Sequence, residues 1–282
     1  MPSNSKTVLI TGCSSGIGHA TAELLTERGF AVYATARRPE TLADLEAKGA
    51  RTLALDVTDE DSMSKAVQAV TDKEGAVDIL INNAGYSQSG AVESVPTQDV
   101  RRQFETNVFG LIRMCQLVLP GMRAQHYGKI VNLSSMGGRL TFPGGGLYHA
   151  TKYAVEALSD ALRFEVKGFG VDVILIEPGL IVTNFGTTAS GSVKSAAQDG
   201  PYDAFNRKVA ETTEQAYEGP MSKLGAGPEA VAQTIAKAIA APRPKARYPV
   251  TASARLMINQ RRFTPDRVWD LIMRTQFPRP RA

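Results

Sequence analysis

The sequence predicts a single α/β domain built on a doubly wound, seven-stranded parallel sheet with helices on both faces. Short apolar runs alternate with longer amphipathic stretches through most of the 282 residues, which is the pattern of repeated strand–helix units. The first apolar run leads into a glycine-rich turn and then into a helical stretch. A hydrophobic content of 43% in a chain of this length is enough for one large core.

The individual elements follow from the spacing of apolar residues. Seven short apolar runs predict strands over residues 8–10, 31–34, 52–55, 79–81, 130–133, 171–176 and 247–250. Helical periodicity between them predicts helices over residues 20–28, 61–73, 97–125, 148–169 and 228–240. Residues 183–227 form a long segment rich in Gly, Ser, Thr and Ala, and segments of this length in compact domains are usually functional or disordered.

The glycine-rich turn follows the first strand directly. Gly12, Gly16 and Gly18 have the spacing G-x-x-x-G-x-G, with Ser14, Ser15 and Ile17 between them. Glycines allow the backbone to turn tightly and to approach a pyrophosphate, while the N-terminus of the following helix offers free N–H groups. The spacing differs from the common G-x-G-x-x-G, so a plain tight turn is the alternative interpretation.

A second pattern joins a tyrosine and a lysine. Tyr148 and Lys152 lie four residues apart, which is one helical turn, and Ser135 precedes the tyrosine by thirteen residues. An ammonium group near a phenol stabilises the phenolate. Lowering the pKa of a tyrosine from about 10 to about 7 takes roughly 4 kcal/mol. An ordinary amphipathic helix with an exposed lysine is the alternative.

These motifs and three others stand in the order and spacing of one family. Together with Asn82-Asn83-Ala84-Gly85, Asn107 and Pro178-Gly179, they closely resemble the short-chain dehydrogenase/reductase family over roughly residues 5–250. The resemblance implies a Rossmann-fold catalytic domain over residues 1–250 that binds NADP(H), a substrate lid over residues 183–227, and a C-terminal extension over residues 251–282. It also implies a homodimer or homotetramer that pairs the helices predicted at 97–125 and 148–169. The glycine turn, the second strand and the extended C-terminus look like the branch that holds 17β-hydroxysteroid and retinol dehydrogenases.

The resemblance implies four catalytic residues. Tyr148 is the general acid and base, and Lys152 lowers its pKa and holds the nicotinamide ribose. Ser135 orients the substrate oxygen, with Ser134 as the alternative. Asn107, in the middle of a predicted helix where asparagine is unfavourable, is implied to relay protons to Lys152 through water.

The cofactor pocket is implied by the same resemblance. Asp56 faces the adenine, although it could also simply form a turn, and the asparagine motif contacts the cofactor and ties strands together. Thr183 and the backbone near Pro178 meet the carboxamide. The complete predicted set is Gly12, Ser14, Ser15, Gly16, Ile17, Gly18, Arg37, Arg38, Asp56, Val57, Asn83, Ala84, Gly85, Tyr148, Lys152, Pro178, Gly179, Ile181 and Thr183.

The cofactor preference is predicted from the end of the second strand. An enzyme that uses NAD usually has an Asp or Glu there for the ribose 2′-hydroxyl, whereas arginine accommodates a 2′-phosphate. This chain has Arg37 and Arg38 and lacks the carboxylate. We therefore expect NADP(H) in preference to NAD(H), with a solvated basic loop as the alternative.

The substrate is expected to be an apolar carbonyl compound or alcohol. The candidate substrate-binding residues are Ser135, Met136, Leu140, Phe142, Tyr148 and Phe185, with Leu147 and Leu180 nearby. Arg139 is the only Arg or Lys evident in this candidate pocket wall. A ketosteroid-like or retinoid-like substrate is favoured. A reductase of 3-oxoacyl thioesters and a catalytically silent protein that senses NADP(H) are the alternatives.

Composition and charge bear on partners. Cys13, Cys115 and the three histidines lack metal-ligand spacing, so we expect no metal. No signal segment or long apolar run is found, which predicts a cytoplasmic protein.

Residues 243–282 carry ten Lys or Arg against two Asp, a net charge of +8 in a chain of net +4. This basic, amphipathic tail predicts either contact with an anionic membrane or packing on its own domain, and nucleic acid is not expected.

Overall fold

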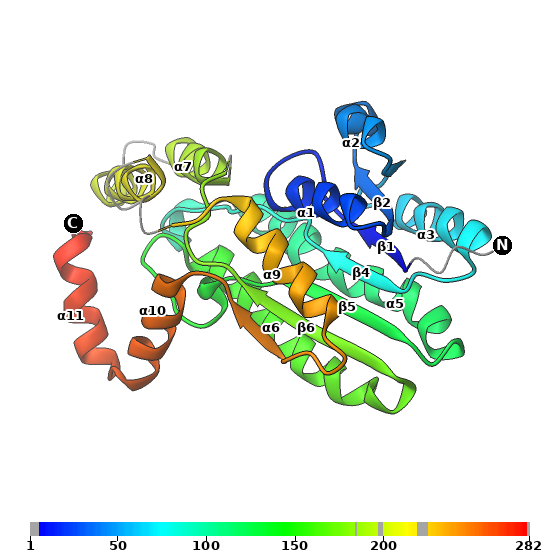
Figure 1. The fold of residues 1–282 in the computed structure, drawn as a ribbon. Coiled ribbons are helices and arrows are strands. Elements are labelled where there is room, and N and C mark those ends of the chain that lie inside the picture. The colour runs from blue at the N-terminus through cyan, green and yellow to red at the C-terminus, as the bar shows by residue number, and fades with distance from the viewer. Residues whose placement is uncertain (1–5, 184, 197–199, 219–224, 281–282) are drawn as a thin grey trace.

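The protein forms one seven-stranded sheet in which every strand pair is parallel (Figure 1). The computed structural model describes residues 6–183, 185–196, 200–218 and 225–280. The strands are β1 (Thr7–Ile10), β2 (Ala31–Ala36), β3 (Arg51–Ala54), β4 (Ile79–Asn82), β5 (Gly128–Leu133), β6 (Val171–Glu177) and β7 (Arg247–Pro249). Their order in the sheet is β3-β2-β1-β4-β5-β6-β7. The predicted α/β fold is confirmed, with each strand boundary within two residues of its prediction.

Helices bury both faces of this sheet. One face is covered by α1 (Gly16–Glu27), α2 (Ala43–Ala47) and α9 (Pro228–Ala240), the other by α3 (Glu60–Glu74), α5 (Gly110–Ala124) and α6 (Gly146–Glu165). In β1, Val8 and Ile10 enter the first core and Leu9 enters the second. A strand between two cores needs apolar side chains on both faces, which explains the continuous apolar run.

The helix predicted over residues 97–125 is present, but a π-helical turn interrupts its α-helical hydrogen bonding. Helix α4 (Thr97–Phe104) leads into a π-helical turn over Glu105–Phe109 before α5 begins. Such turns insert one extra residue into a helix and are frequent at functional sites. Here the turn contains Asn107, which is buried.

The long segment after β6 and the C-terminal extension also contain helices that the sequence pattern did not reveal. They are α7 (Phe185–Ala196), α8 (Asp203–Glu218), α10 (Ala252–Phe263) and α11 (Asp266–Gln276). All four lie at one end of the sheet in Figure 1. A third apolar cluster joins them, in which Trp269 and Met273 of α11 pack with Phe205 and Val209 of α8.

The extension is therefore packed on its own domain, as one of the two predictions for it stated. Several of its apolar side chains nevertheless stay exposed, namely Leu256, Phe263, Val268 and Leu271. Among the described residues, no helix has the length and apolar character that crossing a membrane requires. Contact of the extension with a membrane surface stays a prediction.

The strand order fixes where a ligand can bind. From β1 the chain proceeds outward to β2 and β3, and then returns to place β4 on the other side of β1. The helices that follow β1 and β4 therefore cover opposite faces of the sheet, and in open α/β sheets ligands bind at the carboxyl ends of the strands at such a point. The glycine turn and the asparagine motif are the loops that follow these two strands.

Candidate active site

The glycine turn is shaped by close backbone contacts. Gly12 has a φ of +73°, and a Cβ atom there would lie 2.9 Å from the Cα of Ala84. A Cβ on Gly18 would collide with the carbonyl oxygen of Gly12. Helix α1, which begins at Gly16, has no side-chain cap from Ser15 and no acidic residue in its first turn. Its N–H groups and positive dipole end therefore suit a phosphate group.

The asparagine motif holds this turn from the neighbouring strand. The side-chain amide of Asn83 donates hydrogen bonds to the carbonyl oxygens of Thr11 and Gly12, both at 2.9 Å. In return, the Thr11 hydroxyl oxygen accepts from the backbone N–H groups of Asn83 and Ala84, both at 3.0 Å. Four hydrogen bonds thus join the ends of β1 and β4. The tie between strands that the resemblance implied is present.

The carboxyl end of β2 carries the two arginines. Arg37 and Arg38 follow β2 and are exposed, and neither forms an ion pair within the described residues. Asp56 accepts hydrogen bonds from the backbone and hydroxyl of Thr58 through Oδ1, so it forms the turn considered above. Val57, beside it, is buried, and its carbonyl oxygen packs directly against Gly110.

The segment after β6 closes the other side of the glycine turn. The side chain of Thr183 lies so that a Cβ on Gly16 would be 3.4 Å from its methyl group. Ile181 is bridged to Ala226, and the carbonyl of Pro178 accepts a hydrogen bond from the N–H of Met136 at 2.8 Å. Gly179 packs against the Thr251 hydroxyl. The predicted residues of this segment therefore line the same end of the sheet.

Tyr148 and Ser135 meet at this end. Tyr148 lies in the first turn of α6, and Ser135 follows β5. Their side chains are hydrogen-bonded to each other. The Ser135 hydroxyl also accepts from the N–H of Gly137 at 3.0 Å. Ser134, the alternative, is buried with a hydroxyl that has no hydrogen-bond partner among the described residues.

The charge states of Tyr148 and Lys152 differ from the expectation. Burial raises the pKa of Tyr148, the nearby Tyr217 adds to that increase, and the Ser135 hydrogen bond opposes it. Burial also lowers the pKa of Lys152 to about 8, opposed by the charge of Glu156. The Nζ atom of Lys152 donates to the carbonyl of Leu133 at 2.7 Å and lies 5.8 Å from the centre of the Tyr148 ring. The net pKa shift of Tyr148 in this structure is therefore upward, because desolvation is its largest cause.

The side chain of Asn107 makes three hydrogen bonds within the described residues. Its side chain accepts from the N–H of Tyr86 at 3.1 Å and donates to the Tyr86 carbonyl at 2.9 Å and the Thr151 hydroxyl at 3.1 Å. Gly85 leaves room beside both the Asn107 amide and Nζ of Lys152. Because these bonds engage both ends of the amide, a proton relay would have to use another atom of Asn107.

One predicted substrate contact needs correction, and the basic residue noted near the site is paired within the protein. Leu140 is fully buried in the third apolar cluster, so it packs against α8 and the C-terminal extension instead of lining an open site. Arg139 is held by Glu177, with Nη1 3.3 Å from Oε1, and by Glu156 at 3.8 Å. Met136, Phe142 and Leu147 stay partly exposed near Tyr148 in the chain. The side chain of Phe185 lies outside the described part of the structure.

Comparison with known proteins agrees with this geometry. A family model described as short chain dehydrogenase matches residues 6–192. The chain belongs to the short-chain dehydrogenase family.

Relatives and solved structures support the same assignment. The 3-ketodihydrosphingosine reductase of Bacteroides thetaiotaomicron is 36% identical over 95% of this chain and 96% of that protein. The NADPH-dependent 3-dehydrocapnine reductase of Ornithobacterium rhinotracheale is 36% identical over 94% of each. A short-chain dehydrogenase of Streptomyces avermitilis has a TM-score of 0.81 at 35% identity, covering 96% of this chain and 98% of that one. A serine dehydrogenase solved in its closed form with NADP+ has a TM-score of 0.75 at 28% identity, covering 88% and 95%.

This short-chain dehydrogenase is therefore an oxidoreductase with relatives that bind nicotinamide nucleotides.

Three residues near the candidate site were not assigned to it from the sequence. Thr11 accepts the two N–H groups described above. His149 is buried between Gly137 and Gly145, which fit against its ring, and burial lowers its pKa to about 4. Tyr217 brings α8 close to Tyr148. Only the position of His149, next to the tyrosine, could have drawn attention to it.

The Thr11 hydroxyl gives a sharp test of the strand connection. Thr11→Val keeps the shape but leaves two part-buried N–H groups unpaired, at about 1–2 kcal/mol each, the lower part of the range for buried groups. We expect the free energy of unfolding to fall by about 2–4 kcal/mol and NADPH binding to weaken, measured by denaturant titration and by NADPH fluorescence. Thr11→Ser keeps the acceptor and is the control. Equal behaviour of the two variants would contradict the role assigned to this oxygen.

Proposed function

We propose that this short-chain dehydrogenase uses NADP(H) to interconvert a carbonyl group and an alcohol on an apolar substrate. The hydrogen bond between Ser135 and Tyr148, beside the buried ammonium of Lys152, is the observation that carries the proposal. It joins the three residues with the chemistry that the reaction needs, at the carboxyl end of the sheet where ligands bind.

Each of these residues has a distinct task in the proposal. NADPH supplies a hydride to the carbonyl carbon, or NADP+ removes one in the reverse direction. Tyr148 donates its phenolic proton to the alkoxide oxygen that forms, and Ser135 orients that oxygen. Lys152 is held by the Leu133 carbonyl, so its charge stays next to the phenol and stabilises the phenolate left after proton transfer. The raised pKa of Tyr148 keeps the phenol protonated until then.

Substitution of the tyrosine tests the reaction. Tyr148→Phe removes only the proton donor, so we expect NADPH consumption with a panel of apolar ketones to fall by about 10²–10⁴-fold while the Kd for NADPH stays nearly unchanged. Lys152→Ala should weaken both, because it also leaves the Leu133 carbonyl without its donor. Turnover of Tyr148→Phe close to that of the wild type would rule out the assignment. No activity of the wild type on any member of the panel would favour the catalytically silent alternative.

The substrate is proposed to be an aliphatic ketone with its carbonyl near one end of a long chain. Both relatives are named for a ketone at the third carbon, and dihydrosphingosine is a long-chain amino alcohol. Partly exposed Met136, Phe142 and Leu147 give apolar contacts, and Arg139 is already paired with Glu177. Ketosteroids, retinal and 3-oxoacyl thioesters belong in the same panel, because they present a carbonyl on a comparable apolar body.

A preference for NADP(H) is supported by the two exposed arginines after β2. Neither guanidinium is committed to an ion pair with the described residues, so both are free to bind a 2′-phosphate. A relative at 36% identity is named as NADPH-dependent. The absence of an acidic residue at the end of β2 points the same way.

The preference is tested by replacing both arginines with glutamine. Because charge-assisted hydrogen bonds contribute about 1.5–3 kcal/mol each, Arg37→Gln with Arg38→Gln should weaken NADPH binding on the order of a hundredfold and NADH binding little. The exposed Arg101→Gln in α4 is the control. Equal losses for the two cofactors, or a wild type that prefers NADH in kcat/KM, would overturn the proposal.

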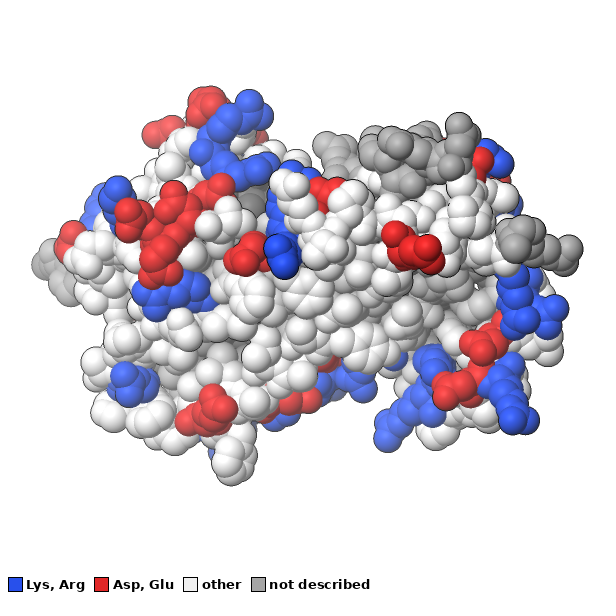
Figure 2. All heavy atoms as spheres, turned by 180° about the vertical axis from the view of Figure 1, so that it is seen from behind, with Lys and Arg blue, Asp and Glu red and all other residues white. Residues whose placement is uncertain are grey.

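Homodimerisation, or assembly into a tetramer, is proposed through α5 and α6. Phe164 is 88% exposed and Phe109 is 52% exposed, and Tyr153, Leu158 and Phe169 are exposed nearby in the chain. Figure 2, which views the molecule from behind the sheet of Figure 1, shows a broad central surface with few charged side chains. Large apolar patches of this kind mark interaction sites.

Light scattering over a range of micromolar concentrations measures this assembly. We expect a stable dimer or tetramer in the wild type and dissociation when Phe164→Asp introduces a charge into the patch. A fully active wild-type monomer would exclude the proposed interface.

Adding vesicles of an anionic phospholipid to the same series tests the proposed membrane contact, which Leu256→Asp in the extension should weaken without changing the assembly. Vesicles that bind neither the wild type nor Leu256→Asp would exclude the membrane contact.

A further inference from the structure

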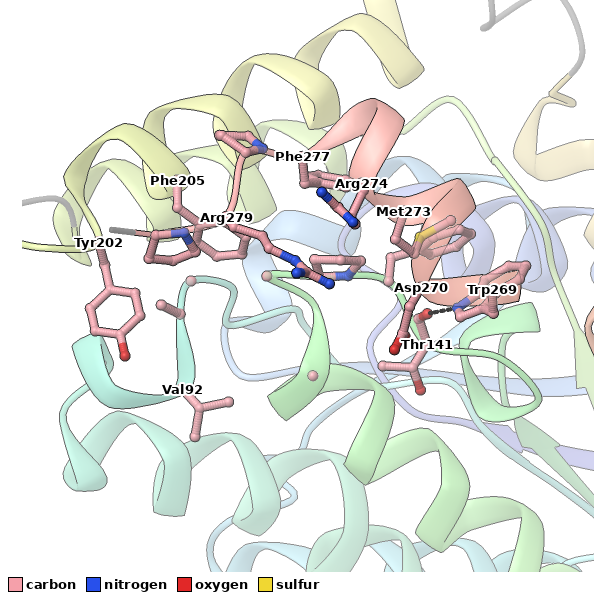
Figure 3. A pocket seen from close by; sticks show the side chains of 18 of the residues that line it. Val92, Thr141, Tyr202, Phe205, Trp269, Asp270, Met273, Arg274, Phe277 and Arg279 are labelled. Atoms are coloured by element: carbon pink, nitrogen blue, oxygen red, sulfur yellow. Dashed lines mark hydrogen bonds between the residues drawn. The ribbon is translucent and has the colours of Figure 1, made fainter. Parts of the chain in front are cut away.

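A cavity of about 870 Å³ lies between the C-terminal extension, α8 and two loops of the catalytic domain (Figure 3). The loops contribute residues 90–93 and 141–146. This volume is in the range of about 300–1,000 Å³ that is typical of small-molecule sites. Neither Ser135 nor Tyr148 is among the described residues that line it. Phe142 lies in its wall, with ring centres 6.1 Å from Trp269 and 5.9 Å from His149, the neighbour of Tyr148.

The floor of the cavity is aromatic and apolar. It is formed by Phe142, Phe205, Trp269, Met273 and Phe277, which come from three separate parts of the chain. Trp269 is fixed in place because its indole N–H donates to the carbonyl of Thr141 at 3.2 Å (Figure 3). This surface can bury an aliphatic chain, and each buried methylene group contributes roughly 0.8 kcal/mol.

Two arginines at the cavity are uncommitted. Arg274 and Arg279 extend toward it in Figure 3, and within the described residues neither makes a hydrogen bond or an ion pair. The third arginine, Arg261, is already engaged by Asp266 at 2.5 Å and by the carbonyl of Thr264 at 2.7 Å. Two guanidinium groups beside an apolar floor are a receptor for an anion attached to a hydrocarbon chain.

The acidic residues limit the charge of that anion. Glu93 accepts a hydrogen bond from the Tyr202 hydroxyl at 2.7 Å, and Asp270 lines the cavity without a partner in the described residues. The residues that line the cavity carry three guanidinium groups, of Arg261, Arg274 and Arg279, against the two carboxylates of Glu93 and Asp270, a net charge of +1. A monoanion therefore fits better than a dianion, and a cation does not fit.

We propose that this cavity binds a single-chain amphiphile with one negative charge, such as a fatty carboxylate. Its chain lies along the floor at Trp269 and Phe277, and its carboxylate is held by Arg274 and Arg279. The cavity shares Phe142 with the proposed substrate contacts, but none of the proposed catalytic residues lines it, so binding there is measured independently of the proposed reaction.

The position of Trp269 supplies the measurement, because it is the single tryptophan of the chain. Titration of the full-length protein with dodecanoate should change the tryptophan fluorescence with a saturable Kd. Dodecanol and dodecylamine, which have the same chain, should bind at least tenfold more weakly. The double variant Arg274→Gln with Arg279→Gln should lose at least tenfold in dodecanoate affinity.

Matched variants distinguish a contact with the two cavity arginines from a general effect of positive charge in the extension. Arg262→Gln with Arg267→Gln removes two exposed arginines of the same extension that do not line the cavity, and it should bind dodecanoate like the wild type. Tyr148→Phe should do the same, because the catalytic site is not involved. The proposal is overturned if both double variants lose affinity equally, if dodecanol binds as tightly as dodecanoate, or if dodecanoate leaves the fluorescence unchanged.

Discussion

The close approach of β1 and β4 at their carboxyl ends is the constraint on which the rest of the site depends. Gly12 and Gly18 allow the turn after β1 to fold against itself and against Ala84, and the Asn83 amide joins that turn to the end of β4. With larger residues at the glycines, the N-terminus of α1 would be displaced from the carboxyl ends of these strands. The end of the protein where we propose that the cofactor phosphates bind is therefore defined by backbone contacts, and the side chains serve mainly to hold the backbone there.

The same end of the sheet positions the proposed catalytic groups through α6. This helix starts just before Tyr148, and its next turn buries Lys152 against the Leu133 carbonyl of β5. The loop between β5 and α6 wraps around His149, which is buried and neutral, and this brings Ser135 to the tyrosine. The hydroxyls of Ser135 and Tyr148 are neutral, and the ammonium of Lys152 beside them is partly desolvated. In the proposed reaction, new charge therefore forms mainly in the transition state, where its stabilisation lowers the reaction barrier most effectively.

The sequence predicted the parts of the molecule that depend on local pattern. Seven apolar runs, the glycine turn and the helix that carries Tyr148 were placed almost correctly, because burial on both faces of a parallel sheet leaves a direct signature in the order of residues. The π-helical turn at Asn107 was missed, since its extra residue depends on hydrogen bonds to Tyr86 and Thr151, which are distant in the chain. Leu140 was assigned to the substrate for a similar reason, because its partners in the third cluster become its neighbours only after folding.

The third apolar cluster shows how the least patterned segments acquire order. Helices α8 and α11 each have an apolar face that neither helix could bury alone. Phe205 and Val209 of α8 are covered by Trp269 and Met273 of α11. Leu140 and Phe142, in the loop before Tyr148, pack into or against the same cluster. Helix α8, the C-terminal extension and the loop before Tyr148 therefore share one set of apolar contacts. A change in the packing of α11 would be transmitted to the loop before Tyr148 by direct contact, through Trp269 and its hydrogen bond to Thr141.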